Sequence, residues 1–397
     1  MKKIINWCIN QIKLAYPLHL DHVGVCLSIV LFGWVLYFLS EKIGLFDPIK
    51  AAFDDFFTTD VYYDIIHSER PAHDDDIVIV DMTKLSSRDE IARVITDIKS
   101  CKPKLLCIDL IFERPSFDAL TDTSLLYSLK LEGCRQVLPC KLRDYNDTTS
   151  VFRNCLYSFF HKMDFKNINW GYSNYRQIRM GGRTRETSLY QRLNDSIVYS
   201  LPYTVACLYQ DMSLKMHNIN ERQIRYDDID FDTIGCNDVL RKAEKIKGRL
   251  VILGTLHEEA DMHFTPIGKM AGVKVLAYSI RTFIKGGEKK ESGKIINWII
   301  AILVWWLAAC VGYWIEKRHP IVFAIIAKIF NFTLGAFLIW ISFEVYAKYN
   351  YNIKLLVPLL GLAMVEDIRQ MYAGIMKWLQ DTTHWRIFNK SLYKKDN

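Results

Sequence analysis

Four long apolar stretches divide the chain into a polar middle region and two apolar ends. One stretch covers residues 23–39, and three follow one another closely at residues 295–315, 321–346 and 351–366. A helix needs about 20 apolar residues to cross a bilayer, with about 17 as the lower limit. The pattern therefore predicts a four-helix membrane region, with one N-terminal span and three C-terminal spans.

These predicted spans differ in how well they suit a bilayer. Residues 295–315 carry no charge, whereas residues 321–346 contain Lys328 and Glu344 and the last span contains Lys354. Ionisable residues inside a span are candidates for function. Lys328 lies near enough to the end of its span for its stem to reach the interface, so we favour snorkelling. The first apolar stretch begins late and no small-residue cleavage site follows it, which predicts an uncleaved anchor.

Basic residues near the membrane set the expected orientation. With four spans, the Lys and Arg residues before the first helix, between the second and third, and after the fourth share one side, which should be the cytoplasm. We therefore expect a cytoplasmic N-terminus (1–22), an extracytoplasmic domain (43–290) and a short cytoplasmic tail (367–397) in the inner (cytoplasmic) membrane. Lys348 and Lys354 lie on the other side, so the bias is incomplete. The residues on the cytoplasmic side are Lys2, Lys3, Lys13, Lys317, Arg318, Arg369, Lys377, Arg386, Lys390, Lys394 and Lys395.

The formal net charge of +7 bears only on which partners the protein is expected to have. Basic residues beside the spans favour contact with membrane lipid headgroups. No dense basic run with interleaved aromatics occurs, so we expect no nucleic-acid partner. The chain also lacks a P-loop, a GxSxG motif, a dinucleotide fingerprint and kinase or cyclase signatures, so we expect neither catalysis nor a cofactor.

The polar region opens with short apolar runs around a helical stripe. Residues 77–80 and 105–110 are rich in Ile, Val and Leu, as is typical of strands buried on both faces. Between them, apolar residues at positions 91, 94, 95 and 98 form one helical face. This order predicts a β-α-β unit over residues 77–112, with parallel pairing of its two strands.

The rest of the polar region extends this pattern. Further strands are predicted over residues 136–139 and 249–254, and an irregular stretch with some strand over 141–195. The expected fold is an α/β extracytoplasmic sensor domain with a mixed, partly parallel sheet flanked by helices. The predicted helices cover residues 53–67, 125–129, 196–209 and 273–283.

Ten cysteines bear on the redox compartment. An oxidising compartment permits disulfides, but the cysteines between the first and second spans are odd in number, which leaves at least one free thiol. No CxxC pair occurs, so we expect no zinc site. Cys107 lies in a predicted buried strand and should pack as a small apolar residue. Pairing stays open among Cys101, Cys107, Cys134, Cys140, Cys155, Cys207 and Cys236.

Three aspartates are candidates for a ligand site. Asp81 and Asp109 end predicted parallel strands, and Asp261 follows another strand in a loop. Open α/β sheets bind ligands beyond the carboxyl ends of their strands, so these carboxylates could hold a cation or a polar ligand. The alternative is that they accept backbone N–H groups and cap turns or helices.

Two further groups are weaker candidates. His257 and His263 flank an acidic loop, but their six-residue separation would not place them on one helix face, so we favour a solvated loop over a metal site. A basic run nearby in the sequence could receive an anionic ligand or lipid headgroups, or form an ordinary charged hairpin face. This run consists of Arg176, Arg179, Arg183 and Arg185.

These elements, in this order, resemble the second class of CHASE domain, an extracellular sensor associated with cyclases and histidine kinases. The resemblance extends from about residue 53 to residue 287, with one helix before it and three after it. It rests first on IVIVDMTK (77–84), where Asp81 ends the strand, and on CIDLIFERPS (107–116), where Asp109 and Phe112 form a D-x-x-F motif.

Two later blocks carry the rest of the resemblance. GYSNYRQIRMGGRTRETSL (171–189) is similar to the family's glycine-and-arginine hairpin, with Gly182 and Arg185 in the expected places. RLVILGTLHEEADMHFTPIGKMAGVKVLAYSIRTFIKGG (249–287) is similar to its closing block and is the most specific match. The family's tryptophan-proline-rich turn is missing from residues 83–88, so a pocket shaped by that turn would differ here.

The resemblance implies a sensor. Family members usually continue into a catalytic domain and this chain does not, so we expect a non-enzymatic sensor or receptor subunit that acts through a cytoplasmic output protein in trans. A homodimer or higher oligomer and an unknown extracytoplasmic ligand are also expected. The alternative is a structural or effector membrane component whose outer domain is an assembly surface. A pore is disfavoured because only Lys328, Asn331 and Glu344 offer polar groups within the spans.

A helical stripe continues from the fourth span into the tail. Ile368, Tyr372, Ile375 and Leu379 recur at spacings of four, three and four, and we expect them to transmit the signal. Pairing with another protomer and an amphipathic helix on the inner membrane surface both stay open. The stripe is followed by aromatic and basic residues, namely Trp378, Trp385, Phe388, Lys377, Arg386 and Lys390.

Overall fold

The computed structural model describes residues 20–36, 38, 63, 71–174, 182–286, 290–349 and 351–383. The chain divides into two compact units, one of Asp60–Lys289 and one of Met1–Thr59 with Lys290–Asn397. Several predictions fall outside the described residues. They are the helix at 53–67 apart from Tyr63, most of the basic run at 176–185, the basic residues at 2, 3 and 13, and the tail beyond residue 383.

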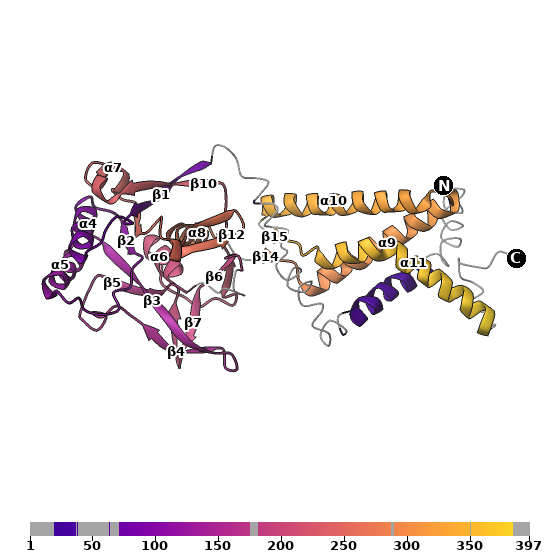
Figure 1. Ribbon diagram of the computed structural model, residues 1–397, viewed down its shortest axis with the longest axis horizontal. Coiled ribbons are helices and arrows are strands. Elements are labelled where there is room, and N and C mark those ends of the chain that lie inside the picture. Colours follow the sequence, from indigo (N-terminus) through magenta and orange to yellow (C-terminus); the bar gives the residue numbers. More distant parts are fainter. Residues whose placement is uncertain are drawn as a thin grey trace, which may run out of the picture. The chain divides into compact units, whose positions relative to one another are not determined.

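A twisted sheet forms the centre of the Asp60–Lys289 unit (Figure 1). Among the described residues it has nine strands in the order β10-β1-β11-β2-β3-β4-β7-β8, with β5 also paired to β3. The neighbours from β10 to β3, and β5 beside β3, are parallel, whereas β3–β4 and β7–β8 are antiparallel. This confirms the predicted mixed, partly parallel sheet. Its strands are β1 (Ala72–Asp81), β2 (Leu105–Ile108), β3 (Arg135–Asn146), β4 (Val151–Leu156), β5 (Ile168–Tyr172), β7 (Tyr190–Leu193), β8 (Ser196–Tyr199), β10 (Ile229–Gly235) and β11 (Leu250–Gly254).

The two strands of the predicted β-α-β unit are parallel but are not neighbours, so that pairing was wrong. β11 lies between β1 and β2 and pairs with both, with Ile79 opposite Ile252 and Ile252 opposite Cys107. All five residues of β11 are buried. A strand that is apolar on both faces is most stable at the centre of a sheet covered on both sides, which explains why the later strand inserts there.

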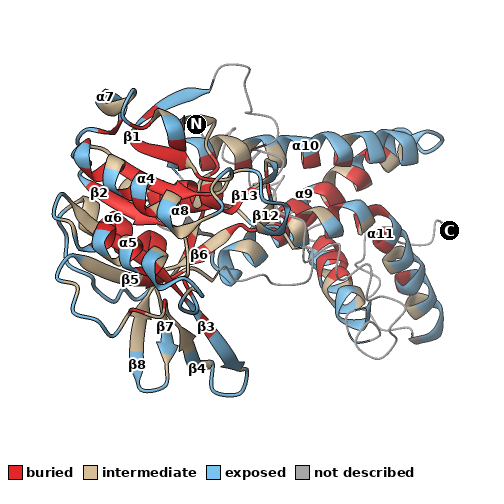
Figure 2. Ribbon diagram, turned by 60° about the vertical axis from the view of Figure 1, so that its left-hand side comes forward, coloured by how far each residue is buried: buried red, intermediate tan, exposed pale blue. Residues whose placement is uncertain are grey.

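Helices cover both faces of this sheet. Alternate strand residues such as Val80, Leu106 and Val251 share one core with α4 and α5, while their neighbours face α6 and α8 on the other side. In Figure 2 the central strand β2 is coloured as buried, whereas β4, β7 and β8 consist mostly of intermediate and exposed residues. The helices are α4 (Arg88–Ser100), α5 (Ala119–Lys130), α6 (Leu201–Tyr209), α7 (Ala243–Ile246) and α8 (Gly272–Ile284).

Local sequence signals fix the ends of these helices. Ser87 caps α4 through a capping box with Glu90, and the stripe that includes Val94, Ile95 and Ile98 is buried, as predicted. The Lys99 ammonium donates hydrogen bonds to three carbonyls at the end of α5, at 2.7–3.1 Å. Burial lowers the pKa of Lys99 to about 8. This lysine therefore joins α4 to α5 through the unsatisfied carbonyls of a helix C-terminus.

The predicted helix over 196–209 is only partly helical. Residues Ser196–Tyr199 form β8, and α6 begins at Leu201, after Ser200 caps its first turn. Pro202 occupies the first turn of α6, where a missing N–H costs nothing. The β-branched residues Ile197 and Val198 instead pair with β7 in an antiparallel hairpin.

Smaller elements complete the domain. Two short antiparallel pairs lie outside the main sheet, one formed by β6 (Glu186–Ser188) with β9 (Glu221–Gln223) and one by β12 (Met262–Thr265) with β13 (Gly268–Ala271). No disulfide joins any of the described cysteines. Cys107 is fully buried in β2, as predicted for a small apolar residue.

The second unit contains long apolar helices. Two of them, α9 (Lys294–Arg318) and α10 (Phe323–Tyr349), are long and apolar enough to cross a membrane, and the helix Leu20–Leu36 is apolar but shorter. These helices support membrane insertion, but they do not establish four spans. The last predicted span and the predicted tail helix form one continuous helix, α11 (Leu356–Thr383).

A single apolar core joins the helix Leu20–Leu36, α9 and α11 within this unit. The Trp305 ring of α9 lies against Gly361 of α11, and its indole N–H donates a 2.9 Å hydrogen bond to the Pro358 carbonyl. Closer to the C-terminus of both helices than this contact, the buried Arg369 guanidinium pairs with Glu366 and Glu316. α9 and α11 are therefore held together by both apolar and ionic contacts.

The start of α9 is also tied to the start of α11. The short strands β14 (Lys290–Glu291) and β15 (Tyr351–Asn352) pair in parallel. Ser292 N–H donates to the Asn352 carbonyl at 2.9 Å, and the Lys354 N–H donates to the Ser292 hydroxyl at 3.1 Å. The segment that enters α9 thus contacts the segment that enters α11.

Candidate functional site

A cavity of about 550 Å³ opens at the carboxyl ends of the central strands. The loop after β2, the middle of β3, the residues that follow β5 and the loop after β11 all contribute to its wall. α6 and α8 close it with Leu201 and Leu276. This is the edge at which open α/β sheets bind ligands.

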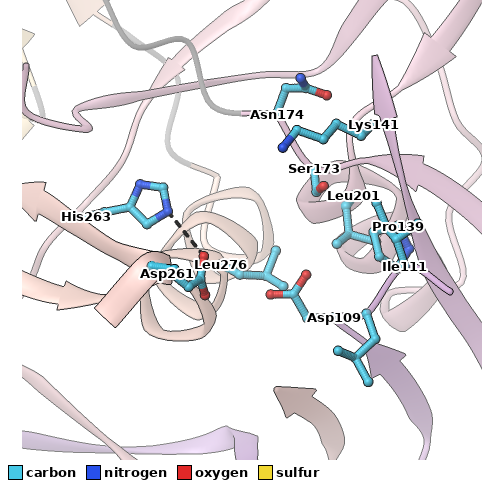
Figure 3. Close-up of a pocket in the computed structure, with 13 residues that line it drawn as sticks. Asp109, Ile111, Pro139, Lys141, Ser173, Asn174, Leu201, Asp261, His263 and Leu276 are labelled. Carbon is cyan, nitrogen blue, oxygen red and sulfur yellow. Dashed lines mark ion pairs between the residues drawn. The ribbon is translucent and has the colours of Figure 1, made fainter. Parts of the chain in front are cut away.

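Asp109 and Asp261 are brought together in this cavity, as Figure 3 shows. Asp109 follows β2 directly, and Asp261 precedes β12. Asp261 lies against the first residue of α8, Gly272, where an added Cβ would stand only 2.5 Å from a carboxylate oxygen. Gly272 therefore leaves the space that the Asp261 carboxylate occupies.

The Asp261 carboxylate influences the ionisation of Asp109. Burial raises the pKa of the Asp109 carboxyl to about 7, the Asp261 charge adds to this rise, and His263 opposes it. His263 Nε2 lies 3.6 Å from Asp261 Oδ1. Among the described residues, no hydrogen-bond donor or cationic group pairs with the Asp109 side chain. Asp109 is thus an acid in the cavity whose charge is not balanced by a direct partner among the described residues.

The opposite wall of the cavity carries a cation and two neutral polar residues. Lys141 extends its amine toward the cavity in Figure 3, beside Ser173 and Asn174. The Asn174 amide bonds both backbone groups of Leu142, at 2.7 and 3.0 Å, and so fixes the segment after β5 against β3. Lys141 is exposed and makes no ion pair with a described residue. This wall was not predicted, because Lys141 sits in a stretch whose strand and register give no separate sequence signal.

Asp81 uses its carboxylate for hydrogen bonds within the fold. Its Oδ1 accepts hydrogen bonds from the Thr83 N–H at 3.0 Å and the Thr83 hydroxyl at 2.5 Å, and from the Leu256 N–H at 3.3 Å. Burial acts to raise the pKa of Asp81, but these hydrogen bonds outweigh it and lower the pKa below its usual value. Asp81 does not belong to the described lining of the cavity. It joins the turn after β1 to the turn after β11, which matches the capping alternative.

The arginine candidates are also outside the described lining. Arg183 is exposed, whereas the Arg185 side chain is buried and its carbonyl accepts the Ile224 N–H at 2.8 Å. The two histidines separate as well, because His263 lines the cavity and His257 is exposed. Within the described part of the chain, no three metal-ligating side chains converge on one point.

The sequence profile of the CHASE2 domain matches residues 28–313. The chain belongs to the CHASE2 domain family. The match confirms the predicted resemblance to an extracellular sensor and includes the helix Leu20–Leu36 in part and most of α9. No curated protein and no solved structure matches the chain.

Residues from two of the blocks that carry the resemblance, Asp109 and Gly254, lie at this edge of the sheet. Asp109 of the D-x-x-F motif lines the cavity, and the motif's Phe112 is buried in the core beneath it. Gly254, which ends β11 in the closing block, lies where an added Cβ would be 2.8 Å from Val273 and 3.5 Å from the Asp109 Cβ. The CHASE2 domain thus uses small residues to bring β2, β11 and α8 close together around the cavity.

Proposed function

We propose that this protein is a membrane sensor subunit whose CHASE2 domain binds a small ligand in the cavity at the carboxyl ends of its strands. The observation that carries the proposal is the unpaired Asp109 carboxylate in a cavity of about 550 Å³, a size suited to a small molecule. An ionisable group without a direct partner in such a cavity is more typical of a binding site than of a structural core.

The proposed membrane arrangement has four spans in the inner (cytoplasmic) membrane, with the CHASE2 domain outside the cytoplasm. α11 lies along α9 for much of its length, which supports a third C-terminal span in its first half. The Tyr372 hydroxyl donates a 3.2 Å hydrogen bond to Asp21, at the start of the helix Leu20–Leu36. This contact supports placing the start of the first span and the second half of α11 on the same side of the membrane.

The proposed signal path follows the chain from the cavity. Gly272 and Leu276 of α8 line the cavity, and five residues separate the end of α8 at Ile284 from Lys290 of β14. β14 pairs with β15, which leads into α11. A ligand that favours one position of α8 would therefore act on α9 and α11 together, provided that it binds the two states with different affinities.

The proposed output is non-enzymatic. We propose that α11 pairs with α11 of a second copy of the chain and that a separate cytoplasmic protein is sensitive to their arrangement. Met371, Ile375 and Trp378 form an exposed apolar stripe on the second half of α11, at spacings of four and three. Exposed apolar side chains at helical spacing favour a helical partner.

The test is a thermal-shift screen of the full chain in lipid nanodiscs against a panel of small metabolites. We expect at least one compound to raise the melting temperature, because binding to the folded state stabilises it. Ala260→Trp should abolish this shift, since Ala260 is exposed and lines the cavity. Glu259→Trp is the matched control, because it adds the same ring at the preceding exposed position, outside the described lining.

Two results would contradict the proposal. A shift that survives Ala260→Trp would place binding outside this cavity. A chain that responds to no compound and purifies only with an obligatory partner would favour the structural alternative.

A further inference from the structure

The cavity has walls of opposite charge. Asp109 and Asp261 present carboxylates on one side, and Lys141 presents an amine on the other (Figure 3). Between them lie apolar side chains, including Ile111, Leu201 and Leu276. The ligand that fits this arrangement has complementary charges at two points and some apolar surface.

The acidic wall favours an N–H cation. Neither Asp109 nor Asp261 accepts a side-chain hydrogen bond from a described residue, and the His263 Nε2 atom lies 3.6 Å from Asp261 Oδ1. An ammonium group carries three donors and could bond both carboxylates at once. Charge-assisted hydrogen bonds of this kind are roughly twice as strong as neutral ones.

The basic wall argues against a ligand that is only a cation. Lys141 would repel an amine without a negative group, and the carboxylates would repel a plain anion. A metal ion is also disfavoured, because the described lining does not bring three metal-ligating side chains together. Both charged walls are satisfied by one molecule only if it carries an ammonium and an anionic group.

We propose that the cavity binds a small zwitterion of the amino-acid class, with its ammonium group between Asp109 and Asp261 and its carboxylate at Lys141. This inference rests on the proposed sensor function and specifies its ligand. The volume of about 550 Å³ exceeds what an amino acid's charged groups need, so the apolar wall formed by Ile111, Leu201 and Leu276 holds the side chain.

Binding should depend on pH because the ammonium group requires an ionised Asp109. The groups that face Asp109 are Asp261, His263 and, across the cavity, Lys141. With a pKa of about 7, Asp109 is mostly protonated at pH 6 and mostly ionised at pH 8. We expect the dissociation constant to fall roughly ten-fold from pH 6 to pH 8.

The experiment is isothermal titration calorimetry of the full chain in lipid nanodiscs. The probes are the twenty standard amino acids, each binder's decarboxylated amine and deaminated acid, and calcium chloride. At least one amino acid should bind, and removal of either charged group should weaken it at least ten-fold, the equivalent of about 1.4 kcal/mol.

Two variants assign the charges. Asp109→Asn should weaken the amino acid and its amine, and Lys141→Gln should weaken the amino acid but not its amine. Neither substitution removes a hydrogen bond among described residues, so both should leave the protein folded. Arg183→Gln is the control, because Arg183 is an exposed cation outside the described lining.

The possible outcomes separate this inference from the sensor function. Equal binding of an amino acid and its amine, with no effect of Lys141→Gln, would overturn the zwitterion in favour of a simple amine. Calcium binding that Asp109→Asn abolishes would overturn it in favour of a metal site. If no amino acid binds while another metabolite gives a shift that Ala260→Trp removes, the zwitterion fails and the sensor function stands.

Discussion

At the scale of single residues, Asp81 and Asp109 show how similar positions acquire opposite properties. Asp81 is the last residue of β1 and Asp109 directly follows β2, yet Asp81 accepts three hydrogen bonds and Asp109 accepts none from a described residue. The pKa of Asp81 is lowered and that of Asp109 is raised to about 7. The same residue type is therefore a structural cap at one strand end and a candidate binding group at another.

This difference gives a pH prediction for Asp109. Its pKa is about 7 in the folded state and about 4 when unfolded, so the folded state binds the extra proton between these values. The contribution of this protonation to the free energy of unfolding is complete below pH 4 and is lost as the pH rises to 7. Asp109→Asn removes this loss and should raise the free energy of unfolding at pH 8 by on the order of 4 kcal/mol.

Thermal unfolding of the full chain in detergent at pH 4.5, 6 and 8 would measure this effect. The parent and Asp109→Asn should differ most at pH 8 and least at pH 4.5. If the stability of the two proteins changed with pH in the same way, the pKa of Asp109 would not be raised in the folded state.

Substitution of Asp81 should lower the stability of the protein, whereas substitution of Asp109 should raise it. Asp81→Ala leaves the Thr83 N–H without its acceptor and removes one of the two acceptors of the Leu256 N–H, which should cost about 1–3 kcal/mol of stability. Asp81→Asn keeps one acceptor oxygen and should cost less. Thermal unfolding provides the measurement, and ligand binding provides the second readout. A stable Asp81→Ala protein that no longer binds ligand would place Asp81 in the site.

At the scale of helices and strands, the hydrophobic periodicity predicted whether a segment is a helix or a strand better than it predicted which strands are neighbours in the sheet. The stripe of α4 and the apolar runs of β1, β2 and β11 report burial directly, so these elements were predictable. Their order in the sheet was not, because the insertion of β11 between β1 and β2 depends on contacts across more than 100 residues. Lys141 was missed for the same reason, since only the folded sheet places it opposite Asp109 and Asp261.

The contact between α9 and α11 gives a prediction at this scale. An added Cβ at Gly361 would stand 2.1 Å from the Trp305 ring, which is buried and bonded to Pro358. Gly361→Ala must therefore displace the ring or separate the helices, and should destabilise their packing by about 1–3 kcal/mol. Thermal unfolding of the full chain in detergent would measure this loss.

Gly374 in the same helix is the matched control. Outside its own helix, no atom of a described residue lies within 4 Å of an added Cβ there, so Gly374→Ala should leave stability unchanged or raise it by up to about 1 kcal/mol. If both substitutions had the same effect, helix propensity rather than the Trp305 contact would explain it.

At the scale of the whole molecule, the predicted transmission stripe divides into two faces of α11. Ile368 is buried in the bundle core and Tyr372 bonds Asp21, whereas Ile375 is 53% exposed. The physical reason is that α9 ends at Arg318, just beyond the Glu316–Arg369 ion pair. Past this level, α11 loses α9 as a packing partner. The sequence stripe alone could not show where that partner ends.

The exposed face beyond this level is where we expect a second copy to dock. A photo-crosslinking amino acid at position 375 should give an adduct of twice the chain's mass, because Ile375 lies in the exposed stripe with Met371 and Trp378. The same group at position 376 should give little adduct, because Met376 is only 9% exposed and faces the bundle. The proposed signal path through β14 and β15 predicts that ligand changes the yield at 375. If the only adduct is with another protein, the exposed stripe contacts the output partner rather than a second copy of the chain. Equal yields at positions 375 and 376 would show that α11 has no defined docking face.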